Sequence, residues 1–329
     1  MRALIFLTLL FPLAAAPLAR SVTSRVEPRL ATWLMASGAL LLAGTSCGAL
    51  GLLVLSELAR TPWLARVGDW SSSIVADGGL PGGWTSLIAG VLLGAALLAA
   101  ATFAVRRGRA LAGARRHARE LPGHGELVVT EDKCADAYAV PGRPGRIVVS
   151  AGMLDALDER GRAALLAHER AHLRARHHWF TGVARLAAAA NPMVRPLADA
   201  VEFTVERWAD EEAAAAVGDR RLVAQAIASA AIAAKTTRPR RAVLATLGAV
   251  LPGGGPAALS RRLRNRPEDP LRDAGPVPRR VAALLAPAPR PGLPALTVSV
   301  LFLGLAVLCA VKAADHLQDL ISFAHAVSE

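Results

Sequence analysis

The chain has 329 residues, of which 53% are hydrophobic, and a formal net charge of +12. Its mean hydropathy of +0.37 is higher than a water-soluble domain usually has, which indicates a membrane protein. Aromatic residues make up only 4%, so stacking platforms for single strands are scarce and no direct binding to nucleic acid is expected. With only three cysteines, a disulfide framework is excluded.

Four apolar runs are long enough, or nearly so, to cross a bilayer as helices. They are Ala3 to Leu18, Leu30 to Leu55, Trp84 to Val105 and Leu293 to Val311. The first run has an alternative interpretation as a signal peptide, because Arg2 precedes an apolar stretch that ends in small residues. The orientation of the spans in the membrane distinguishes a retained first helix from a cleaved signal peptide.

Arginines beside the apolar runs predict which side of the membrane each loop faces. Six arginines follow the third run between Arg106 and Arg119, whereas acidic residues balance the two arginines between the second and third runs. We therefore expect residues 106–290 in the cytoplasm, where the arginines can also contact anionic lipid headgroups. Cleavage of the first run would place this arginine cluster outside the cell, so four membrane-spanning helices are favoured.

Three short segments of strand-forming residues between the third and fourth apolar runs predict a small sheet. They are Leu127–Thr130, Ala137–Val140 and Arg146–Ser150. Leu222 to Ala234 is apolar but too short to span a membrane, so a buried helix is expected there. Phe180 to Val201 is interrupted by arginines and by two prolines, which argues against a span.

The segment His168-Glu169-Arg170-Ala171-His172 has the H-E-x-x-H pattern of zinc-dependent peptidases. Two histidines four residues apart lie on one helical face, so both imidazoles can bind one metal ion. Glu169 follows His168 on the helix and can take a proton from water at the metal. Asp158 provides a helix cap upstream. We expect His168 and His172 as ligands and Glu169 as the general base; a solvated surface helix is the alternative.

A catalytic zinc ion requires a third protein ligand and an open fourth position. Glu202, Glu206 and Asp210 are spaced four apart and form one acidic stripe on a predicted helix. By itself such a stripe is better explained as an ordinary exposed helix face, but beside H-E-x-x-H it favours ligation. We predict Glu206 as the third ligand of one zinc ion per chain, with Glu202 as the alternative. Asp210 is expected to orient a ligating histidine.

The segments 167–172 and 206–210 resemble the E-x-x-A-D gluzincins. These include the HtpX-like and CAAX prenyl membrane peptidases and the BlaR/MecR-type antirepressor peptidases. Residues 147–154 fit the same families, and residues 280–285 do so more loosely. The resemblance implies an α+β zincin-like (gluzincin) domain and the same roles for His168, His172, Glu206, Glu169 and Asp210.

The donor that would stabilise the oxyanion is not identifiable from these motifs. His177, His178 and Arg266 are candidates, although a structural role is favoured for each.

Three spans before the motif and one after it resemble the BlaR/MecR arrangement. The chain is thus expected to comprise three transmembrane helices in residues 1–105, a cytoplasmic zinc metallopeptidase domain in 106–290, and a fourth helix with a short extracellular tail in 291–329. No large penicillin-binding sensor follows the fourth span, so β-lactam sensing is not expected.

The expected function is hydrolysis of a protein or peptide substrate at the inner face of the cell membrane. A transcriptional repressor is one candidate substrate. The alternatives are an HtpX-like quality-control peptidase and a non-catalytic membrane scaffold, and the intact H-E-x-x-H motif argues against the scaffold.

Overall fold

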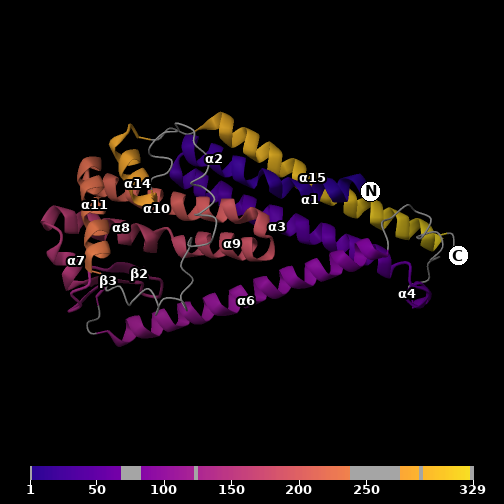
Figure 1. Cartoon of the computed structure of the whole chain (residues 1–329), viewed down its shortest axis with the longest axis horizontal. Helices are drawn as coiled ribbons and strands as arrows, with labels where there is room; N and C mark the ends of the chain where they lie inside the picture. Colours follow the sequence, from indigo (N-terminus) through magenta and orange to yellow (C-terminus); the bar gives the residue numbers. More distant parts are fainter. Residues whose placement is uncertain (1, 68–82, 122–124, 238–274, 289–291, 327–329) are drawn as a thin grey trace. The chain divides into compact units, whose positions relative to one another are not determined.

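A computed structural model describes residues 2–67, 83–121, 125–237, 275–288 and 292–326. The chain divides into two compact units, whose elements are labelled in Figure 1. Unit 1 comprises Met1–Arg107, Trp179–Val205 and Pro289–Glu329. Unit 2 comprises Gly108–His178 and Glu206–Ala288.

Long apolar helices build most of unit 1. They are α1 (Arg2–Leu10), α2 (Ala15–Arg25), α3 (Pro28–Leu58), the first part of α6 (Trp84–Glu120) and α15 (Leu293–Ala326), with the short helix α4 at Pro62–Val67. Among the described residues, four stretches are long and apolar enough to cross a membrane: Ala3–Arg25, Pro28–Leu58, Trp84–Glu120 and Leu293–Ala326. Each contains one of the apolar runs predicted from the sequence. These helices indicate a multi-pass membrane protein.

The first of these stretches is not a regular α-helix throughout. A 3₁₀ turn at Phe11–Ala14 separates α1 from α2, with Pro12 at its start. Proline lacks the backbone N–H that an α-helix needs in its interior, so the break falls where the sequence cannot continue the α-helical hydrogen bonds.

A helical hairpin from the middle of the chain also belongs to unit 1. It consists of residues 179–205, which lie in α9 (His177–Ala190), a 3₁₀ turn (Pro192–Val194) and the beginning of α10 (Arg195–Val217). Its alanines and aliphatic side chains share one buried core with α2, α3 and α15. Asn191 and Pro192 interrupt the hairpin, as the sequence predicts. The expected domain boundaries, in contrast, assign this stretch to the peptidase domain.

Two buried polar contacts fix the hairpin against α3. The Thr32 hydroxyl donates to the Thr204 hydroxyl at 2.9 Å, and the Asn191 side-chain amide donates to the Ser46 hydroxyl at 3.1 Å. Within an apolar bundle, such contacts satisfy polar groups that would otherwise be buried without a partner.

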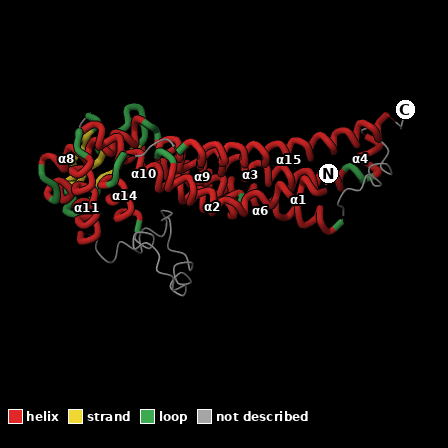
Figure 2. Tube along the Cα trace, turned by 90° about the horizontal axis from the view of Figure 1, so that it is seen from above, coloured by secondary structure: helices red, strands yellow, loops and turns green. Residues whose placement is uncertain are grey.

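Unit 2 contains a three-stranded sheet, drawn in yellow in Figure 2. The strands β1 (Leu127–Thr130), β2 (Ala137–Val140) and β3 (Arg146–Ser150) have the bounds predicted from the sequence, so that prediction is confirmed. The strand order is β1-β3-β2, with β1 parallel and β2 antiparallel to β3. The central strand β3 is the most buried, with four of its five residues buried.

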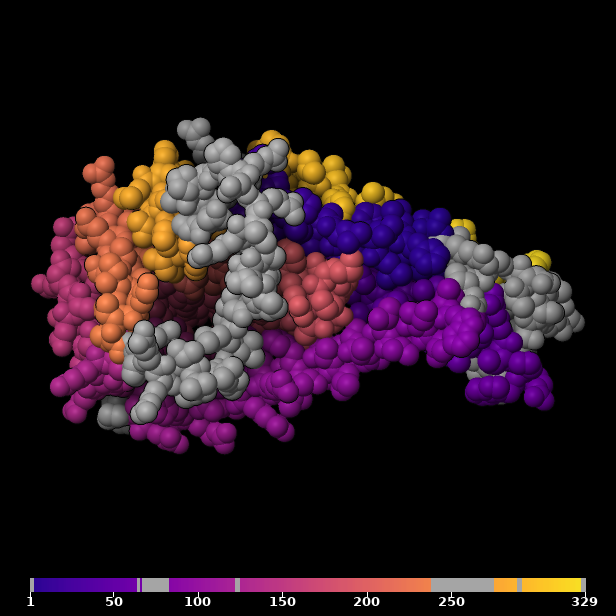
Figure 3. Space-filling view, viewed as in Figure 1, coloured from indigo at the N-terminus to yellow at the C-terminus, as the bar shows by residue number. Residues whose placement is uncertain are grey.

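Helices α7 (Ala151–Asp155), α8 (Glu159–Arg174), α11 (Arg220–Thr237) and α14 (Pro276–Leu285) complete unit 2, together with the ends of α6 and α10. One core joins β3, α7 and one side of α8, and a second joins α8 with α10, α11 and α14. The second core is rich in alanine, which lets the helices approach closely. Figure 3 shows α11 and α14 adjoining at the surface.

The helix predicted at residues 222–234 lies within α11, but it is buried on one face only. Val223, Ala224 and Ala226 are buried, whereas Ile232 is 64% exposed. Sequence hydrophobicity therefore overstated its burial, because alanine-rich helices carry apolar residues on all sides.

Candidate metal centre

Helix α8 presents two histidines on one face. The Asp158 carboxylate begins the helix by accepting a hydrogen bond of 2.7 Å from the Gly161 amide. Ten residues beyond that cap comes His168, and His172 follows one turn later, so their rings lie one above the other. The Nε2 atoms of the two rings are 3.1 Å apart. The helix therefore orients both side chains toward one point.

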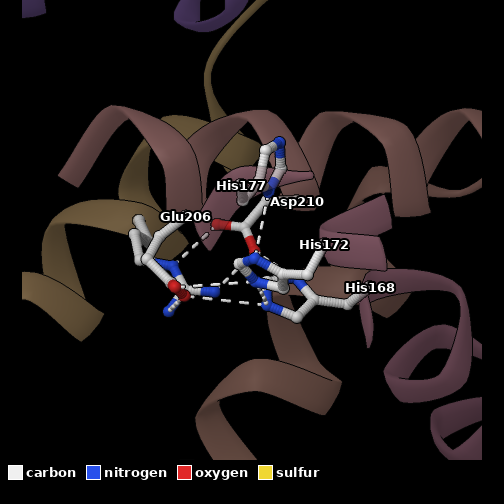
Figure 4. Close-up of polar contacts among 6 residues, drawn as sticks. His168, His172, His177, Glu206 and Asp210 are labelled. Atoms are coloured by element: carbon white, nitrogen blue, oxygen red, sulfur yellow. Dashed lines mark hydrogen bonds and ion pairs between the residues drawn. The ribbon is translucent and has the colours of Figure 1, made fainter. Parts of the chain in front are cut away.

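Helix α10 brings a carboxylate to that point. Glu206 Oε1 lies 3.5 Å from His172 Nε2, and Glu206 Oε2 lies 3.6 Å from His168 Nε2. The candidate ligand atoms of these three residues lie within 4.8 Å of one another, and no other such group is found in the part of the chain that the structure describes. Figure 4 shows the two rings facing Glu206, with His177 and Asp210 beside them.

The chemistry of these donors fits a catalytic zinc ion. Two imidazole nitrogens and one carboxylate oxygen form the protein part of a site whose fourth position is left for water or substrate. The Glu206 side chain is 38% exposed, so the group is accessible from solvent. A structural zinc site, by contrast, is usually closed by four protein ligands.

Glu169 lies next to His168 in α8 and is buried, with 8% of its surface exposed. Burial raises the pKa of its carboxyl group, and the charge of His168 partly opposes that shift. A carboxyl group with a raised pKa is a better proton acceptor than an ordinary glutamate, which suits a general base.

Asp210 is 1% exposed and faces the outer nitrogen of His168. Its Oδ1 lies 3.0 Å from His168 Nδ1. Despite burial, Arg280 and His168 lower the pKa of Asp210 and keep it ionised. The carboxylate therefore favours the His168 tautomer that leaves Nε2 facing the other candidate ligands.

The two histidines of α8 have opposite pKa shifts in the metal-free site. Burial alone would lower the pKa of His168, but Asp210 and Glu206 raise it to about 10. Burial and the positive charge of His168 lower the pKa of His172 to about 4. His168 thus carries the proton of the pair, and His172 Nε2 is free to accept a hydrogen bond from it.

His177 contacts the far side of His172. The Nδ1 atoms of the two rings are 3.0 Å apart, and the His177 ring packs 4.6 Å from that of Trp208. Burial, then His172, lower the pKa of His177 to about 3, so it is neutral and can accept the His172 N–H. This placement gives His177 a structural role and does not make it an oxyanion donor. His178 is outside the ligand group, and Arg266 lies outside the described residues.

Glu202, the alternative third ligand, does not join the group. Its carboxylate pairs with Arg185 of α9. The structure therefore brings together His168, His172 and Glu206, with Asp210 behind His168, and leaves Glu202 elsewhere on α10.

Arg280 of α14 also reaches the centre, where it contacts Asp210 and Glu206. The sequence alone points to Arg280 only through the loose resemblance of residues 280–285. The available signal was a pair of arginines, Arg279 and Arg280, within a helix that is otherwise apolar, and the sequence does not say which of the two is buried.

Two histidines, a glutamate and a buried adjacent carboxyl group have the chemistry that a metallopeptidase site requires. Comparison with known families supports that class: residues 106–185 match the model of Peptidase family M48, and the match indicates a metallopeptidase, a hydrolase. It includes the H-E-x-x-H helix and the strands before it, but ends before Glu206. No curated protein and no solved structure matched the chain.

Proposed function

We propose that this chain is an integral-membrane zinc endopeptidase. The observation that carries the proposal is the convergence of His168 Nε2, His172 Nε2 and the Glu206 carboxylate beside the buried Glu169. The M48 match and the four apolar helices support it independently.

In this proposal His168, His172 and Glu206 would hold the ion, and Asp210 and His177 would orient the two rings. Zinc would supply a Lewis acid that activates water and polarises the scissile carbonyl. The Glu169 carboxylate accepts a proton from the attacking water and passes it to the amine of the leaving peptide. The Glu169 carboxylate then returns to its ionised state.

The substrate is proposed to be a protein that reaches the inner face of the membrane. The arginine cluster after the third apolar run supports a cytoplasmic peptidase domain. A transcriptional repressor fits the span arrangement that resembles the antirepressor peptidases. Quality control of membrane proteins is the alternative, since it requires the same chemistry but no dedicated substrate.

The test of this function begins with the full-length chain purified in detergent. We expect about one bound zinc ion per chain and cleavage of casein that a chelator abolishes. Glu169→Gln should retain zinc and the fold but lose activity by at least about a hundredfold, because water loses its base. Retention of near wild-type activity by this variant would refute the mechanism.

The substrate class requires a second measurement, in cells that carry either the wild type or Glu169→Gln. Accumulation of one full-length repressor in the variant would support the regulatory role. Accumulation of many unrelated membrane proteins would support quality control instead.

A further inference from the structure

Arg280 uses all three nitrogens of its guanidinium group at the metal centre. Its Nε donates to Asp210 Oδ2 at 2.8 Å, and its Nη2 donates to Asp210 Oδ1 at 2.6 Å. Its Nη1 lies 2.8 Å from Glu206 Oε2. The side chain is only 12% exposed, so these contacts are largely shielded from water.

The two carboxylates that Arg280 joins have different tasks. Glu206 is the proposed third ligand, and Asp210 faces the outer nitrogen of His168 at 3.0 Å. Arg280 therefore connects one ligand directly and a second ligand through its orienting carboxylate. We propose that Arg280 is a positioning residue of the zinc centre, which holds Glu206 and His168 in the geometry that both need to share one ion. This proposal rests on the proposed zinc-peptidase function.

Charge supports this role. Glu206 and Asp210 stand one turn apart on α10, and Glu169 adds a third carboxyl group nearby. Like charges at this spacing repel each other, and burial strengthens the repulsion. With a divalent ion bound, the ion and Arg280 together balance the three carboxylates. A lysine could supply the charge, but not a planar fork that binds one carboxylate with two parallel hydrogen bonds and reaches a second.

The helix that carries Arg280 is anchored independently of the site. Leu284, one turn after Arg280, is 2% exposed in the core that α14 shares with α8 and α11. Arg220 donates to the backbone carbonyls of Ala283 and Leu284, at 3.0 Å each. The packing of Leu284 and the hydrogen bonds from Arg220 thus hold α14 in place without Arg280. The helix in turn places Arg280 at the metal centre.

The test compares Arg280→Lys and Arg280→Gln with a matched control in the full-length protein in detergent. The control is Arg160→Gln. Arg160 forms an ion pair of 3.4 Å with Asp219 on the surface of unit 2, and its side chain is 69% exposed. Zinc affinity is measured by competition with a chelator. Ligand geometry is measured from the visible absorption of the cobalt-substituted protein, which a purely structural ion pair would leave unchanged.

We expect both Arg280 variants to bind zinc about 10- to 100-fold more weakly and to change the cobalt spectrum. Arg160→Gln should match the wild type in both measurements. If Arg280→Gln does not fold, the double variant with Asp210→Asn removes the unpaired carboxylate. Its loss of zinc affinity should exceed that of Asp210→Asn alone, because Glu206 still lacks its contact with Arg280, but should stay below the combined losses of Asp210→Asn and Arg280→Lys.

A folded Arg280→Lys protein with wild-type zinc affinity and an unchanged cobalt spectrum would overturn the positioning role. So would additive losses in the double variant. Absence of zinc from the wild type, by contrast, would refute the proposed function itself, so the two failures are distinguishable.

Discussion

Arg185 binds both carboxylate oxygens of Glu202, through Nε and Nη2, at 2.6 Å each. Its Nη1 also lies 2.8 Å from Asp199 Oδ1. A bidentate pair of this kind is among the strongest polar contacts between side chains. Glu202 is therefore paired with an arginine of unit 1, although it stands only one turn before the proposed ligand Glu206 on α10.

This pairing leads to a prediction on ligand identity. Glu206→Ala should purify without zinc, since it removes one of three protein ligands. Glu202→Ala should retain about one zinc ion per chain, but unfold at lower temperature, because Arg185 loses its bidentate partner. Zinc content by atomic absorption and a thermal unfolding curve in detergent measure both effects. Loss of zinc from Glu202→Ala alone would show that the third ligand was wrongly chosen.

Zinc binding should release protons. At pH 7 His168, with its pKa raised to about 10, is protonated in the metal-free site, whereas His172, with its pKa lowered to about 4, is not. The ion must displace the proton of His168, so about one proton leaves and the apparent affinity rises roughly tenfold per pH unit near neutrality.

Calorimetry in buffers of different ionisation enthalpy measures this release. Asp210→Asn serves as the control, because it removes a carboxylate that raises the pKa of His168. This variant should release fewer protons than the wild type when it binds zinc at pH 7. Equal proton release from the two proteins would contradict the role of Asp210 in raising the pKa of His168.

The membrane orientation is testable by cysteine labelling on a cysteine-free background. We expect an impermeant reagent to reach positions near Ser72 and Ser328 in intact cells, but not positions near Ser150 or Arg240. Six arginines after the third apolar run resist transfer across the membrane, which is the reason for this expectation.

Ser72, Ser328 and Arg240 lie outside the described residues, and Ser150 is buried. Trp63, which is 60% exposed, and the exposed Glu159 are therefore better positions on the two sides. Trp63→Cys should be labelled in intact cells, and Glu159→Cys only after permeabilisation. Labelling of Glu159→Cys in intact cells would place the peptidase domain outside and revive the signal-peptide interpretation.

Gly152 should tolerate no side chain. A Cβ atom there would lie 2.1 Å from the Lys133 carbonyl oxygen, so backbone would have to move. Gly152→Ala is expected to destabilise the protein by about 3 kcal/mol. Gly113→Ala, in open space on α6, should instead stabilise it by about 1 kcal/mol, because alanine favours helix. Thermal unfolding measures the difference in stability between the two variants. Equal unfolding temperatures would refute the prediction.

The amino-acid sequence alone was enough to predict the features that depend on local pattern. The strands follow from short runs of strand-forming residues, with proline and glycine between the second and third, and the apolar helices follow from length and composition. The spacing of His168 and His172 placed both rings on one face, since a helix fixes that relation within a single turn.

The tertiary structure decided which distant residues meet. Glu202 and Glu206 are equivalent in the sequence stripe, and contacts with other helices distinguish them. Arg185 binds Glu202, whereas Glu206 lies beside His168, His172 and Arg280. Arg280 reaches the metal centre from a helix seventy residues beyond Asp210, and residues 179–205 share their core with the apolar helices. The partner of a charge, and the core that a hairpin joins, depend on contacts between segments far apart in the chain, and local pattern carries no information about those contacts.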